Sequence, residues 1–110
     1  MASKAVVIIS TGEKEKAFTG IMYAFNAQKN KWLDDVKVIF FGPFEDLLCR
    51  DEEVADFASQ LLEHETPIAC KRLSDNAGIS GKIEEMGYGV EYVGTIISNA
   101  IKDGYVPMVF

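Results

Sequence analysis

The sequence predicts a three-layer α/β/α sandwich, a single domain built on a mostly parallel sheet of about five strands. Short apolar runs rich in β-branched residues alternate with segments of helical periodicity along the whole chain. The chain has 110 residues, enough for one domain with a real core and too few for two. We therefore expect residues 1–110 to fold as one unit, with right-handed crossovers that place helices on both faces of the sheet.

Five segments have the composition of β-strands, with runs of Val, Ile, Phe or Tyr bounded by turn residues. They are 5–9, 36–41, 67–70, 90–93 and 105–110. The first is apolar throughout, which is typical of a strand covered on both faces. Pro107 lies inside the last run and predicts an edge strand, because proline cannot donate to a sheet ladder. The pattern leaves the order of the strands in the sheet open.

Helical periodicity fills the segments between these runs. The residues expected to face the core share one helical face in each segment: Phe18, Ile21, Met22 and Phe25; Val54, Phe57, Ala58, Leu61 and Leu62; Ile96, Ile97, Ala100 and Ile101. Acidic residues at 51–53 suit the N-terminus of the second of these helices, and 103–104 should end the last one. Residues 71–77 predict a further short helix that Gly78 ends.

Composition and charge exclude several classes of protein. The formal net charge is −6 and no block of basic residues is present to neutralise phosphates, which argues against binding of DNA or RNA. The longest apolar runs, 5–9 and 38–41, are far shorter than the roughly 20 residues of a membrane helix. The two cysteines make no disulfide framework, and the first residues lead directly into a strand rather than into a signal peptide. We therefore expect a cytoplasmic protein with no membrane or nucleic-acid partner.

Cys70 is the strongest candidate for a catalytic residue. It stands at the carboxyl end of the 67–70 strand and at the entrance to the 71–77 helix, where the N-terminal N–H groups favour a thiolate. Lys71 and Arg72 follow directly and would add positive potential that supports the thiolate. A thiolate in this place can attack an electrophile or carry sulfur without a separate general base.

The alternative for Cys70 is structural, because free cysteine is among the most buried residue types and often fills a gap in the core. The packing interpretation is favoured more strongly for Cys49, which shares an apolar helical side with Leu47 and Leu48. Acidic neighbours should also raise the pKa of Cys49. The two cysteines form no C-x-x-C pair, so a thioredoxin-like redox motif is absent.

Ligands of parallel α/β sheets bind where loops leave the carboxyl ends of the strands. Three of these loops supply the residues of the expected pocket: Ser10, Thr11, Gly12, Gly42, Gly94 and Thr95. The first loop lacks a nucleotide-binding glycine motif, and the spacing of Ser10 and Glu13 instead predicts a capping box at the start of a helix. Gly94 and Thr95 could supply N–H donors to an anion at the start of the last helix.

His64 is the single histidine of the sequence and lies between two glutamates near the C-terminus of a helix. The helix dipole and the acidic neighbours favour a cation there, which explains the residue without catalysis. The carboxylate pairs at 34–35, 52–53 and 84–85 are sequence neighbours that do not face each other, so they predict solvated charge rather than an acid–base pair. We expect neither a metal nor an organic cofactor.

The order of elements and the segment 68–79 resemble the DsrE/TusD-like (DsrE/DsrF-like) family, small α/β proteins associated with sulfur relay. Three features carry the resemblance, which extends over nearly the whole chain. They are a first strand leading into a Phe/Met-rich helix, the 41–43 and 47–48 segments with the acidic helix start at 51–54, and a strand-end cysteine whose helix closes on Gly78-Ile79.

The resemblance implies that Cys70 accepts a sulfane sulfur as a persulfide and passes it to a partner thiol, so donor and acceptor proteins are expected. No other catalytic residue carries over, and Lys71-Arg72 are bulkier than the residues that often follow this cysteine in relay members. The resemblance also implies a homo-oligomer, commonly a trimer or hexamer, with Phe44, Tyr105 and Phe110 at the interface if they are exposed together. The alternative function is a non-catalytic oligomer of the same fold that binds a small ligand or an anion, with Cys70 merely packed.

Overall fold

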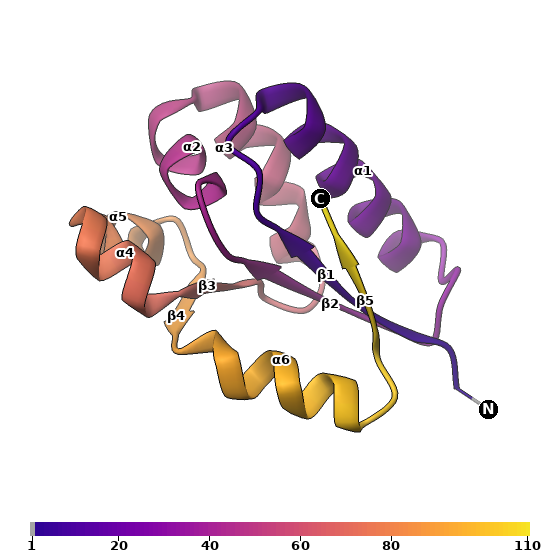
Figure 1. Ribbon diagram of the computed structural model, residues 1–110. Coiled ribbons are helices and arrows are strands. Elements are labelled where there is room, and N and C mark those ends of the chain that lie inside the picture. The colour runs from indigo at the N-terminus through magenta and orange to yellow at the C-terminus, as the bar shows by residue number, and fades with distance from the viewer. Residues whose placement is uncertain (1) are drawn as a thin grey trace.

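The strands form one five-stranded sheet in the computed structural model, which describes residues 2–110 (Figure 1). All neighbouring strands are parallel, in the order β4-β3-β2-β1-β5. Their bounds are β1 (Lys4–Ile9), β2 (Asp35–Phe40), β3 (Ile68–Cys70), β4 (Gly89–Glu91) and β5 (Val106–Val109). The predicted α/β class is therefore confirmed, with a sheet that is parallel throughout.

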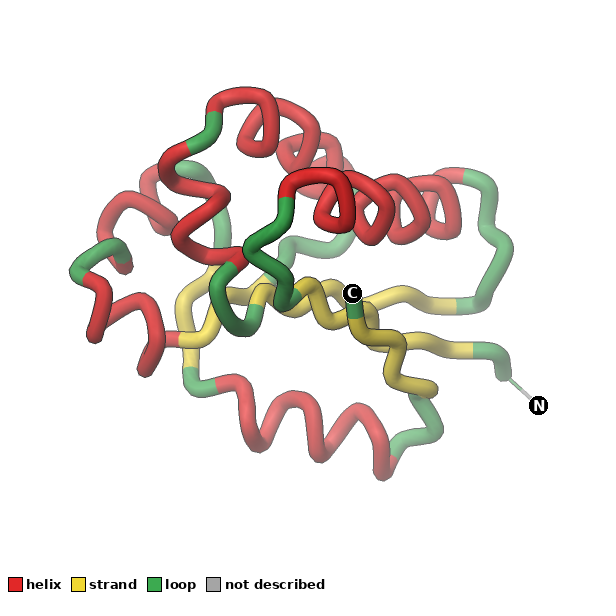
Figure 2. The backbone as a smooth tube through the Cα atoms, turned by 45° about the horizontal axis from the view of Figure 1, so that its top comes forward, coloured by secondary structure: helices red, strands yellow, loops and turns green. Residues whose placement is uncertain are grey.

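Helices cover both faces of the sheet, as Figure 2 shows most clearly. In chain order they are α1 (Lys14–Lys29), α2 (Phe44–Arg50), α3 (Glu52–Ala58), the 3-10 helix η1 (Ser59–Glu63), α4 (Lys71–Ala77), α5 (Ser80–Glu85) and α6 (Val93–Lys102). The chain steps from β1 to β4 in one direction, so right-handed crossovers place α1, α2 and α3 on one face. The return from β4 to β5 reverses that direction and leaves α6 on the other face.

The core is divided by the sheet into two unequal parts. Phe40, Phe44 and Leu61 belong to the larger buried cluster, on the face that α1–α3 cover. The smaller cluster lies on the α6 face and consists of Val6, Ile8, Ile39, Cys70, Val93 and Ala100. Because α6 is the one helix on that face in the part of the chain that the structure describes, some apolar surface there stays open to solvent, and Ile101 of α6 is exposed.

Helix α1 presents a different face to the sheet from the one that the periodicity predicts. Its buried positions are mostly small: Ala17, Gly20, Ile21, Ala24 and Ala27. Met22 is exposed, and Phe18 and Phe25 are only partly buried at the flanks. The reason is close approach, because small side chains let the helix backbone lie near the strands and the large residues then pack beside the contact.

The capping box expected at the start of α1 does not form. Helix α1 begins at Lys14 with Glu13 as its N-cap and no side-chain capping bond, so Ser10 and Glu13 form no capping box. Instead, the main-chain N–H groups of Ser10 and Thr11 donate to the main-chain oxygen of Phe110, at 2.7 and 3.2 Å. A long-range contact with the residue after β5 thus takes the N–H of Ser10, and Thr11 Oγ1 accepts the N–H of Glu13.

The bounds of most other predicted elements agree with the structure to within one or two residues. Helix α4 spans 71–77 and ends at Gly78, whose φ of +70° is the left-handed geometry that favours glycine. Strand β4 lies at 89–91 instead of 90–93, because Val93 already starts α6. Strand β5 is at the sheet edge, as Pro107 predicts, whereas α5 has no counterpart among the predicted elements.

Among residues 2–110, every helix is too short or too polar to cross a lipid bilayer.

Candidate functional site

Cys70 lies where the sequence places it, at the carboxyl edge of the sheet. It is the last residue of β3, pairs in register with Glu91 of β4, and is the N-cap residue of α4. The turn from strand to helix occurs at this residue, with an extended φ and ψ of −68° and 114°. Only 6% of Cys70 is exposed, so the thiol is largely covered in this state of the protein.

The side chain of Cys70 belongs to the buried cluster on the α6 face, together with Val93 in the first turn of α6. Tyr92 is the N-cap of that helix and makes no side-chain capping bond, and Gly94 and Thr95 follow it as exposed residues. The start of a ten-residue helix therefore lies on the same side of the sheet as the thiol. The partial positive charge of such a helix end stabilises nearby anions.

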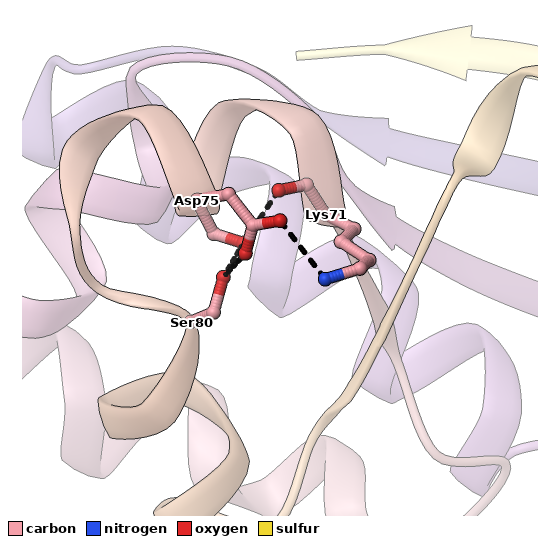
Figure 3. A network of polar contacts seen from close by, with 4 residues as sticks. Lys71, Asp75 and Ser80 are labelled. Atoms are coloured by element: carbon pink, nitrogen blue, oxygen red, sulfur yellow. Dashed lines mark hydrogen bonds and ion pairs between the residues drawn. The ribbon is translucent and has the colours of Figure 1, made fainter.

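Lys71 directs its ammonium group to a carboxylate on its own helix (Figure 3). Its Nζ donates to Asp75 Oδ2 at 2.9 Å, and Ser80 Oγ donates to Asp75 Oδ1. The hydrogen bond with Asp75 raises the pKa of Lys71, and the hydrogen bond from Ser80, followed by that from Lys71, lowers the pKa of Asp75. The cation next to Cys70 is thus paired with an anion one helical turn away, while Arg72 is exposed.

The residues of the expected pocket that follow β1 and β2 lie close together, but they pack directly against each other. Gly42 has a φ of +129°, and a Cβ at this position would lie 2.5 Å from Ser10 Oγ. Phe44 donates its N–H to the main-chain oxygen of Ser10 at 3.0 Å, and Gly12 faces Pro43. The loops after β1 and β2 therefore close against each other. Thr11 Oγ1 accepts the N–H of Glu13 within the first loop.

The remaining pocket residues lie elsewhere, because Gly94 and Thr95 start α6 on the opposite face of the sheet. A cavity of about 410 Å³ lies at the amino ends of β2 and β3, at the opposite end of these strands from Cys70. It is lined by Gln28, Lys31, Leu33, Asp34, Asp35, Val36, His64 and Glu65. His64 is exposed there, with its ring 5.7 Å from that of Phe25.

Within residues 2–110, no three His, Cys, Asp or Glu side chains converge in a way that could hold a metal ion.

Glu45 is the residue whose environment the sequence does not reveal. It lies in the first turn of α2, is only 2% exposed, and neither carboxyl oxygen has a hydrogen-bond partner within the described chain. Burial raises its pKa to about 7, with the nearby main-chain N–H of Gly42 acting in the opposite direction. Helix α2 packs against α4, the helix that Cys70 caps. Asp46, the next residue, is also acidic but exposed. Nothing in the sequence distinguishes these two positions, so the sequence gives no signal that Glu45 is buried.

Cys49 lies one turn further along α2 and is half-buried. Burial raises the pKa of its thiol most, while Lys82 opposes this effect and Asp46 and Glu45 reinforce it. The expected direction of the shift is therefore confirmed, but its main cause is loss of solvent rather than the acidic neighbours.

The interface expected from Phe44, Tyr105 and Phe110 does not exist as one exposed surface. Phe44 is fully buried in the larger core cluster, where its ring lies 4.8 Å from that of Phe40. Tyr105 and Phe110 are half-buried and pack on opposite faces of the sheet.

Comparison with known proteins shows the fold and no function. No protein-family model matches the chain, and no curated protein matches it. A solved structure that resembles it is a conserved protein of unknown function from Bacteroides thetaiotaomicron, with 24% sequence identity and a TM-score of 0.87. The match covers 97% of this chain and 95% of that one. The chain therefore shares its α/β fold, over nearly its whole length, with this bacterial protein.

Proposed function

We propose that the protein carries sulfane sulfur as a persulfide on Cys70 and relays it between the thiols of partner proteins. The observation that supports this most is the position of the thiol at the carboxyl end of β3, at the start of α4 and on the side of the sheet where α6 begins. Helix N-termini stabilise a thiolate, which is the form of cysteine that reacts with sulfur donors.

The proposed reaction consists of two exchange steps without net oxidation. The Cys70 thiolate attacks the outer sulfur of a donor persulfide, forms a new S–S bond, and releases the donor thiolate with the electron pair of the broken S–S bond. An acceptor thiolate then attacks the outer sulfur of the Cys70 persulfide, and the Cys70 thiolate leaves. The donor and the acceptor are proteins or small molecules with a reactive thiol, and neither step uses a metal or an organic cofactor.

Exposed apolar residues surround this edge of the sheet and are suited to contact such partners. Phe41 directly follows β2, Tyr92 directly follows β4, and Leu73 lies on α4; all three are exposed. Since 6% of Cys70 is accessible, transfer requires the covering side chains to move when a partner docks. We place the protein in the cytoplasm, where the thiol stays reduced, and propose that it works as a homo-oligomer, a trimer or a hexamer.

The burial of Cys70 also supports a second candidate function, that of a binding protein without covalent chemistry. In this case the thiol fills the core beneath α6, and the uncapped N-terminus of α6 contributes N–H groups to an anion or small ligand between subunits. Slow alkylation of native Cys70 by iodoacetamide would favour this candidate over sulfur transfer.

Mass spectrometry of the intact protein after incubation with cysteine persulfide tests the proposal. We expect wild type and Cys49→Ser to gain one sulfur atom and Cys70→Ser to gain none. Circular dichroism must show that Cys70→Ser keeps the wild-type fold, since a serine in the buried cluster costs stability. Absence of the adduct from wild type, or its retention in Cys70→Ser, overturns the proposal.

A further inference from the structure

Glu45 is the one charged side chain that is buried among residues 2–110. It is 2% exposed, and neither of its carboxyl oxygens has a hydrogen-bond partner within these residues. A carboxylate in such a place is costly unless it is paired, so the folded state favours the neutral carboxyl group. The main-chain N–H of Gly42 favours the ionised form, but its effect is smaller than that of burial.

The cations around α2 do not pair with Glu45. Helix α2 packs against α3, α4 and α5, and α3 contains neither lysine nor arginine. The side chain of Arg72 in α4 is exposed, and the other cations have partners: Lys71 pairs with Asp75, Lys82 donates to the main-chain oxygen of Cys49, and Arg50 pairs with Asp46. The remaining charged groups on the packed helices are exposed carboxylates, which oppose a second negative charge: Glu52, Glu53, Asp56, Glu84 and Glu85. The thiol of Cys49, one turn along α2, is neutral at pH 7 because burial raises its pKa.

The first turn of α2 also holds two loops together. Phe44, next to Glu45, donates its N–H to the main-chain oxygen of Ser10 at 3.0 Å, and this bond joins the loop after β2 to the loop after β1. Gly42 lies between β2 and this turn with a φ of +129°. Because glycine adopts other backbone conformations at little cost, Gly42 can absorb a rotation of the turn that follows it.

We propose that Glu45 is a proton-dependent switch at the carboxyl edge of the sheet. With the carboxyl group neutral, the first turn of α2 stays packed and the loops after β1 and β2 remain in contact. Loss of the proton moves this turn into water and separates the two loops. Ligands of parallel sheets bind at such loops, so the open state offers Ser10, Gly12 and Gly42 as a pocket that the closed state lacks. The switch involves neither Cys70 nor the proposed sulfur transfer.

The equilibrium between the closed and the open state depends on pH because Glu45 has a different pKa in each. In the closed state burial raises the pKa to about 7, and in the open state the hydrated carboxyl group has its ordinary pKa of 4.5. The closed state is therefore favoured most strongly below pH 4.5. Between pH 5 and 8, the equilibrium constant for opening rises roughly seventyfold.

Amide hydrogen exchange tests the switch when it is measured by NMR between pH 5 and 8 and corrected for the intrinsic pH dependence of exchange. We expect the protection of the Phe44 N–H to fall roughly seventyfold over this range in wild type, because its bond to Ser10 exists only in the closed state. Glu45→Gln should keep this protection constant. Asp46→Asn, which changes the exposed neighbouring carboxylate, should behave as wild type does.

The amides of Val6 and Val7 separate local opening from complete unfolding, because both residues are fully buried in β1, an interior strand of the sheet. We expect these amides to be at least tenfold better protected than that of Phe44 at every pH. Constant protection of Phe44 in wild type, equal protection of Phe44 and β1, or an unchanged pH dependence in Glu45→Gln overturns the proposal. Glu45→Met, which fills a similar space without an ionisable group, takes the place of Glu45→Gln if that variant does not fold.

Discussion

Gly20 of α1 lies against the ring of Phe110, so closely that a Cβ on Gly20 would be 2.9 Å from both Cβ and Cγ of Phe110. This contact joins the first helix to the end of the last strand, and it explains why a helix interior contains a glycine.

Replacement of Gly20 by alanine should therefore destabilise the protein. Alanine favours a helix over glycine by about 1 kcal/mol, but the displaced Phe110 ring costs about 1–3 kcal/mol of packing. We expect a net loss of about 1 kcal/mol in urea unfolding at pH 7. Gly81→Ala in α5 is the control, since open space surrounds this position, and it should be neutral or slightly stabilising. Equal effects of the two variants would contradict the close contact.

Glu45 should make stability depend on pH in the direction opposite to most carboxylates. Its pKa is raised from 4.5 in the unfolded chain to about 7 in the folded protein, so folding favours the protonated form. Stability from this group is complete below pH 4.5 and is lost as pH rises through about 7, by at most about 3 kcal/mol.

The variant Glu45→Gln isolates this effect because it keeps the shape and removes the charge. We expect the difference in unfolding free energy, Glu45→Gln minus wild type, to increase between pH 4.5 and 8. Asp46→Gln, on the exposed side of the same helix, should show no such increase. A pH-independent difference for Glu45→Gln would show that the carboxyl group finds a partner on ionisation.

Removal of the Asp75 carboxylate should make Cys70 more reactive. Asp75→Asn releases Lys71 from its ion pair and leaves an uncompensated cation on the residue that follows Cys70. We expect alkylation of Cys70 in a Cys49→Ser background to be roughly threefold faster at low salt, with the gain lost in high salt. Asp46→Asn removes the partner of Arg50 in an equivalent pair on α2 and should leave the rate unchanged.

Lys82 should control the reactivity of Cys49. Its Nζ donates to the main-chain oxygen of Cys49 at 2.7 Å and lowers the pKa of a thiol that burial has raised. In a Cys70→Ser background, Lys82→Met should slow the alkylation of Cys49 at pH 8 by roughly two- to fivefold. Lys102→Met in α6 is the control. An unchanged rate for Lys82→Met would show that access, and not charge, limits the reaction.

The sequence predicts those parts of the fold whose signals are local. The alternating runs indicate the α/β class, Gly78 marks the end of α4, and Pro107 identifies the edge strand. Each depends on the backbone of one residue or on a short pattern, and none requires knowledge of distant contacts.

The parts that the sequence does not predict depend on tertiary contacts. The small residues of α1 face the sheet because Phe110 and the strands approach the helix closely, a relationship that spans the whole chain. Ser10 lacks its capping role because the main-chain oxygen of Phe110, the residue after β5, accepts its N–H, and Thr11 Oγ1 accepts the N–H of Glu13. The position of Cys70 follows from the pattern, whereas its burial depends on α6, which comes more than twenty residues later.

Among residues 2–110, α6 is the helix that covers the Cys70 side of the sheet, so the reactivity of Cys70 depends on local stability. Detachment of this single helix would uncover the thiol while the larger cluster beneath α1–α3 stays intact, so the required free energy is a fraction of that for complete unfolding. Amide hydrogens of α6 should accordingly exchange faster than those of β1 and β2. Access to the sulfur atom then depends on the free energy with which the ten residues of α6 pack against the sheet.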